Sequence, residues 1–208
     1  VTNQNYNIYF NYGEFLIYHN IDLEKGYSYI KTGLDYCNNL KLNLNFSKAY
    51  AFQILGRYFE TKKDFKQALS YYQKAIILSS NNFTDTTISE NPSDFTNIYG
   101  GRILYYLKYK ANALLKVYQQ NNDSLSLEYA LNTSLKAIEI INKMRFIYTS
   151  EAKNFLISEQ EKQTFDFTEH LAFLLYTRTG NPSYLKMGFN INEQGRGFSL
   201  LSSIRSQR

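Results

Sequence analysis

The pattern of small and aromatic side chains within residues 52–75 limits most strongly what this chain can fold into. It consists of seven positions at helical spacing: Phe52, Leu55, Gly56, Phe59, Ala68, Tyr72 and Ala75. We interpret Gly56 and Ala68 as facing positions that let two antiparallel helices approach closely, with Phe59 and Tyr72 filling the space beside them. Ala75 leaves room for the next helix. Because one such hairpin cannot bury its apolar face alone, the pattern predicts neighbouring helix pairs.

The same seven positions closely resemble one tetratricopeptide repeat (TPR), in which Leu-Gly is followed by an aromatic, a small, an aromatic and a second small residue. The resemblance implies an all-α solenoid of antiparallel helix pairs, a class of protein that binds partners and seldom performs chemistry.

In the TPR family, the first helices of the pairs form most of the inner surface. The resemblance therefore places a peptide-binding groove at Tyr50, Gln53, Arg57 and Glu60, continued by the aligned faces of the helices expected near residues 6–18 and 98–120. Arg57 would pair with a carboxylate of the peptide, and Tyr50 would cover an apolar side chain. The alternative is that these four side chains are simply solvated.

Apolar residues recur at helical period along nearly the whole sequence, and no alternating strand pattern is present. The prediction is an all-α fold of seven or eight helices. The expected helices span residues 6–18, 23–39, 47–61, 64–79, 98–120, 126–146, 150–179 and 183 to the end. Asp22 is the expected N-cap of the second helix, and Gly180-Asn181-Pro182 ends the seventh.

An internal repeat supports this organisation, because residues 22–30 parallel residues 64–72 and a similar pattern returns at residues 127–130. The polar stretch 79–97 has no period and contains Pro92, so we expect a surface loop there. The prediction is one TPR-like domain over residues 1–208. It holds two repeats in 1–80, a loop insertion at 79–97, and divergent repeats with a linker toward a C-terminal domain in 98–208.

Residues 123–208 resemble the segment that precedes the caspase-like CHAT peptidase domain of bacterial TPR–CHAT proteins. The closing motif of that segment matches at Phe189, Glu193, Gly195, Arg196, Gly197 and Leu200-Leu201. Gly195 and Gly197 replace the usual Ser and Ala, and each weakens a helix by roughly 0.5–1 kcal/mol, so we expect the last helix to be kinked or partly unwound. The peptidase implied by the resemblance would follow Arg208, so no catalytic residue is carried over.

Composition argues against several other functions. The net charge of +5 is modest and its basic residues are scattered, so no nucleic-acid surface is predicted. No run of apolar residues is long enough to cross a membrane. Cys37 is expected as a buried thiol, and His19 and His170 have no closing set of ligands for a metal. We therefore expect no enzymatic activity, no metal and no cofactor in this chain.

The sequence supports two hypotheses for function. In the first, the chain is the regulatory helical-repeat part of a bacterial TPR–CHAT protein that receives a protein or peptide, or its own C-terminal domain. In the second, it is the sensor region of a TPR-bearing histidine kinase or transcription regulator. The chain begins with Val1 and shows no signal peptide. We expect a cytoplasmic protein, although this start leaves room for a signal peptide upstream.

Overall fold

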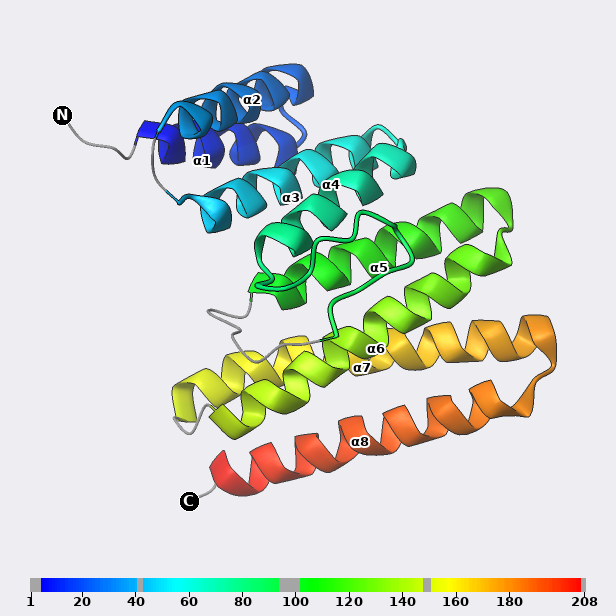
Figure 1. The fold of residues 1–208 in the computed structure, drawn as a ribbon. Coiled ribbons are helices and arrows are strands. Elements are labelled where there is room, and N and C mark those ends of the chain that lie inside the picture. Colours follow the sequence, from blue (N-terminus) through cyan, green and yellow to red (C-terminus); the bar gives the residue numbers. More distant parts are fainter. Residues whose placement is uncertain (1–4, 41–42, 94–101, 148–150, 207–208) are drawn as a thin grey trace. The chain divides into compact units, whose positions relative to one another are not determined.

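The computed structural model describes residues 5–40, 43–93, 102–147 and 151–206. Within these residues it contains eight helices and no strand, which confirms the predicted all-α class (Figure 1). The helices are α1 (Asn5–Tyr18), α2 (Leu23–Asn39), α3 (Asn45–Thr61), α4 (Phe65–Leu78), α5 (Arg102–Asn121), α6 (Ser124–Ile147), α7 (Glu151–Thr179) and α8 (Pro182–Ser206).

The predicted helix ends agree with the observed ones to within a few residues. The predicted starts at residues 98 and 150, and the predicted loop residues 94–97, lie outside the described residues. Residues 79–93, which follow α4, contain no helix.

The chain divides into two compact units, Val1–Ala113 (unit 1) and Leu114–Arg208 (unit 2), and the boundary falls within α5. In unit 1, α1 packs along α2 and α3 packs along α4 (Figure 1). In unit 2, α7 packs along both α6 and α8. Consecutive helices therefore form antiparallel pairs, as the sequence predicted. None of the described helices is long and apolar enough to span a membrane.

The two helix pairs of unit 1 contain the same kind of packing contact, a glycine of the first helix against a large side chain of the second. A Cβ atom added to Gly13 of α1 would lie 2.7 Å from Cδ1 of Ile30, and one added to Gly56 of α3 would lie 2.3 Å from Cε1 of Tyr72. Ile30 and Tyr72 each lie on the second helix of their pair, at matching positions of the internal repeat. The ring of Tyr72, rather than Ala68, supplies the nearest atoms to Gly56.

The other positions of the seven-residue pattern are also packed. Leu55, Ala68, Tyr72 and Ala75 are fully buried, whereas Phe52 and Phe59 are half-buried. The second helices of both pairs begin in the same way. Asp22 accepts a hydrogen bond from the Lys25 amide at 2.9 Å, and Asp64 accepts one from the Gln67 amide at 3.1 Å. The predicted N-cap at Asp22 is confirmed.

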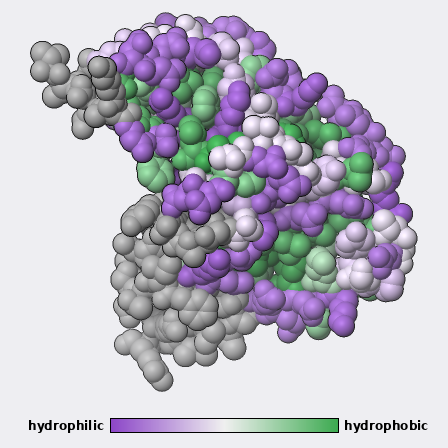
Figure 2. All heavy atoms as spheres, viewed as in Figure 1, coloured by the Kyte–Doolittle hydropathy of each residue, from purple (hydrophilic) through white to green (hydrophobic). Residues whose placement is uncertain are grey.

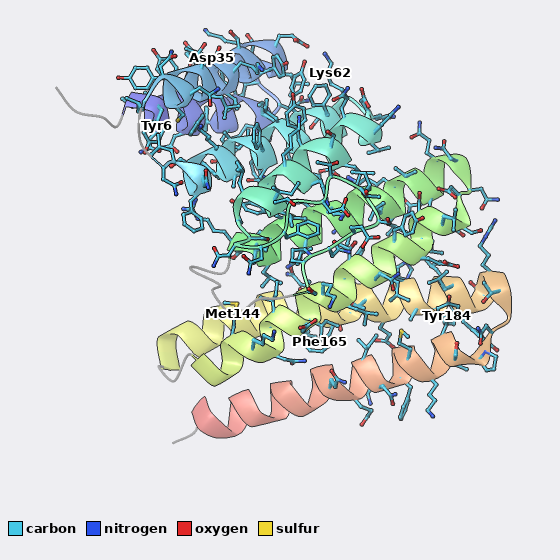
Figure 3. The ribbon with its side chains drawn as sticks, in the orientation of Figure 1. Tyr6, Asp35, Lys62, Met144, Phe165 and Tyr184 are labelled. Atoms are coloured by element: carbon cyan, nitrogen blue, oxygen red, sulfur yellow. The ribbon has the colours of Figure 1, made fainter. Side chains whose placement is uncertain are left out.

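The expectation of a partly unwound last helix is wrong, because α8 is continuous from Pro182 to Ser206. Gly195 lies against α7, where an added Cβ atom would be 3.2 Å from Cβ of Phe165. Figure 3 shows Phe165 pointing from α7 toward α8. The close packing of α7 on α8 offsets the low helix propensity of this glycine.

Candidate functional site

The first helices of unit 1 form the candidate binding surface, which we call the first-helix face. It is built from Glu14 and Tyr18 on α1, Tyr50 and Arg57 on α3, and Arg102 and Tyr109 on α5. Three pairs of these side chains contact one another across helices: Tyr50 with Glu14, Arg57 with Tyr18, and Arg102 with Tyr50.

Tyr50 is the centre of the first group of contacts. Its hydroxyl donates a hydrogen bond to Oε2 of Glu14 at 2.5 Å, and the guanidinium of Arg102 stands 5.5 Å from the centre of its ring. Burial raises the pKa of Tyr50, and the carboxylate of Glu14 raises it further. The phenol is therefore protonated at neutral pH and keeps its donor role. One tyrosine thus connects α1, α3 and α5.

Arg57 is the centre of the second group of contacts. Its guanidinium lies 5.2 Å from the centre of the Tyr18 ring, a cation–π arrangement that fixes its direction. Tyr109 stacks on Tyr72 of α4, with the ring centres 5.7 Å apart and the planes 18° from parallel. Burial raises the pKa of Tyr109, and the positive charge of Arg57 acts in the opposite direction. The positive charge of Arg57 therefore acts on the Tyr109 phenol, which is neutral near pH 7.

The four residues predicted from the sequence do not contribute equally to this surface. Tyr50 and Arg57 are half-buried and remain partly accessible. Gln53 and Glu60 are only 9% exposed, so they offer little area to a partner. The hydroxyl of Tyr72 donates to Oε2 of Glu60 at 2.6 Å, which ties Glu60 to α4.

The sequence indicated that α1 and α5 would continue the groove, but it did not identify Glu14, Tyr18 or Arg102. Their roles arise from pairwise contacts between helices, and such contacts depend on the offset of each helix along its neighbour. Tyr50 and Arg57 on α3, like Arg102 and Tyr109 on α5, stand seven residues apart, and this shared spacing is the sequence signal that could have indicated Arg102.

Unit 2 contains a second concave feature, a groove of about 340 Å³ between α6 and α8. It is lined by Leu135, Ile138, Ser183, Lys186, Met187, Asn190, Ile191 and Gln194. Figure 2 shows apolar surface between α8 and the helices α6 and α7, in the lower half of the view. In the described part of the chain, no three His, Cys, Asp or Glu side chains gather as a metal site would require.

Comparisons with known proteins support the fold. No model of a known protein family matches this sequence, and no curated protein matches it. The crystal structure of the de novo designed helical repeat protein DHR64 is similar, with a TM-score of 0.55. The likeness covers 99% of this chain and 98% of that chain at 12% sequence identity. At this identity the likeness shows the fold alone, and the fold is a helical repeat.

Proposed function

We propose that this chain is a protein–protein interaction module that binds an extended partner segment on the first-helix face of unit 1. The observation that supports it best is the fixed position of two guanidinium groups, Arg57 over Tyr18 and Arg102 over Tyr50. An arginine already held by an aromatic ring loses less side-chain entropy when it binds a ligand. Helical repeats form extended surfaces of this kind.

The chemistry of the face favours a peptide that presents a carboxylate. Glu14 already accepts from Tyr50, and Glu60 already accepts from Tyr72. The two guanidinium groups can each form charge-assisted hydrogen bonds to an incoming carboxylate. The half-buried rings of Tyr50 and Tyr109 supply rigid apolar area beside them.

Our finer proposal places the chain in a bacterial TPR–CHAT protein, because residues 123–208 resemble the segment before that peptidase. It divides one TPR-like domain into two repeats in 1–80, an insertion at 79–97 and divergent repeats in 98–208. In this proposal the chain is cytoplasmic and regulatory and performs no catalysis itself, and nucleic acid is not its partner.

The open reading frame beyond the codon of Arg208 tests whether the chain belongs to a TPR–CHAT protein. A caspase-like domain supports it, whereas a kinase or DNA-binding domain would favour the signalling alternative.

A selection from a random peptide library tests the binding function. Peptides are selected on the wild-type chain and then compared on the Arg57→Ala and Arg102→Ala double variant, with Lys66→Ala as control. Lys66 is an exposed lysine of α4 outside the first-helix face. We expect selected peptides rich in Asp and Glu whose affinity falls at least tenfold in the double variant and is unchanged in the control. Peptides that bind the wild type, the double variant and the control equally would refute the proposal.

A further inference from the structure

A buried polar cluster joins α4, α5 and the segment between them. Lys110 of α5 is fully buried, and Gln73 of α4 is 2% exposed. Both side chains point at the segment formed by residues 85–91. This cluster is separate from the first-helix face.

The ammonium group of Lys110 is fully provided with acceptors. Its Nζ donates to Oε1 of Gln73 at 2.7 Å, to the carbonyl oxygen of Glu90 at 2.7 Å and to Oδ1 of Asn91 at 2.9 Å. These three oxygens match the three N–H donors of a protonated lysine. Two of them belong to the segment.

The side-chain amide nitrogen of Gln73 contacts backbone carbonyl oxygens of the segment. Its Nε2 lies 2.8 Å from the carbonyl oxygen of Asp85, 3.1 Å from that of Thr87 and 3.2 Å from that of Glu90. The segment also holds its own shape, because Oδ1 of Asp85 accepts from the Thr87 amide at 2.8 Å. Two helical side chains therefore recognise a turn chiefly by its carbonyl oxygens.

The charges around Lys110 come from the same segment. Burial lowers the pKa of Lys110 to about 7, and the carboxylates of Glu90 and Asp85 act to raise it. The group that α4 presents is the uncharged amide of Gln73. A buried lysine without acceptors would destabilise the unit strongly, so the site needs an oxygen-rich occupant.

We propose that Gln73 and Lys110 form a peptide-binding site of unit 1 that residues 85–91 occupy in cis. Its ligand class is a peptide turn that presents several carbonyl oxygens and one Asn side chain. The donors are buried on the helices, whereas Asp85, Thr86, Thr87 and Glu90 of the occupant are exposed. The site and its occupant are thus distinct parts of the chain, and the proposal predicts that a peptide supplied in trans takes the place of the segment.

The test separates the occupant from the site. In the full chain, residues 82–93 are replaced by a Gly-Ser linker of equal length, and a fluorescent synthetic peptide of residues 82–93 is added. Fluorescence anisotropy should show saturable binding that weakens at least tenfold in the Lys110→Met background and is unchanged in Lys66→Met. A linker variant with the wild-type circular dichroism spectrum that binds no peptide overturns the proposal. Equal binding by the Lys110→Met variant also overturns it.

If the linker variant does not fold, a second experiment on the intact chain tests whether Gln73 holds the segment. Amide hydrogen exchange is then compared between the wild type and Gln73→Leu. Exchange at Thr87 and Glu90 should be at least tenfold faster in the variant, with α1 and α2 unchanged. Unchanged exchange at both amides would show that Gln73 does not hold the segment and would overturn the proposal.

Discussion

Gly56 lies where α3 and α4 approach so closely that little more than a hydrogen atom fits. An added Cβ atom would be 2.3, 2.6 and 2.8 Å from three atoms of the Tyr72 ring. That ring is fully buried, and its hydroxyl is bonded to Glu60, so it cannot move aside freely. The contact between α3 and α4 therefore depends on this glycine.

We predict that Gly56→Ala lowers the free energy of unfolding by about 1–3 kcal/mol, because the new methyl group overpacks the contact. Gly188→Ala is the matched control, since its Cβ atom would meet its nearest neighbour at an ordinary 3.7 Å. The control should be as stable as the wild type, or more stable by about 0.5–1 kcal/mol through helix propensity. Urea denaturation followed by circular dichroism measures both. Equal stability of Gly56→Ala and the wild type would show that the pair packs differently.

Lys110 gives unit 1 a pH dependence with a definite sign. Its pKa is about 7 in the folded chain against an ordinary value of 10.5, so the unfolded chain binds more protons between these values. The contribution of Lys110 to stability is therefore least below pH 7 and increases as the pH rises toward 10.5.

We predict that the wild type gains stability relative to Lys110→Met between pH 7 and pH 9. The comparison of two variants cancels the titration of other groups, including the buried thiol of Cys37. Urea denaturation of both chains at the two pH values provides the measurement. Parallel pH profiles for the two chains would mean that Lys110 does not change its protonation in this range.

At the scale of helices, the boundaries could be predicted from the sequence because their signals are local. The periodicity of apolar residues identified each helix, and Asp22 marked the start of α2. Burial of Lys110 could not be predicted in this way. It appeared in the sequence as one of several scattered lysines, and its acceptors come from a polar segment with no periodicity.

The N-caps of the second helices can be tested directly. Asp22→Ala and Asp64→Ala each remove an acceptor from the first turn of a helix, and each should cost about 0.5–2 kcal/mol. Asp35→Ala is the control, because Asp35 is exposed and lies in the second half of α2, away from its first turn (Figure 3). Chemical denaturation should place both cap variants below the control in stability. A control that loses as much as the cap variants would contradict the assignment.

At the scale of the whole molecule, the helical-repeat fold could be predicted because the sequence pattern of one helix pair recurs in another, and in unit 1 this recurrence appears as the contacts Gly13–Ile30 and Gly56–Tyr72. The details of the binding surface could not be predicted from the sequence. Gln53 and Glu60 share the predicted face with Arg57, yet their burial depends on how closely α4 and the other neighbours pack. The partners of Arg57 and Tyr50 come from other helices, so only the assembled unit brings them together.

The first-helix face is proposed to bind a partner segment. Hydrogen exchange with mass spectrometry, in the presence and absence of a peptide selected from the random library, locates the bound surface. Binding on the first-helix face should slow exchange in α1, α3 and α5 and leave exchange in α8 unchanged. Protection confined to α8 and the groove beside α6, or no protection in α3, would show that the peptide does not bind on the first-helix face.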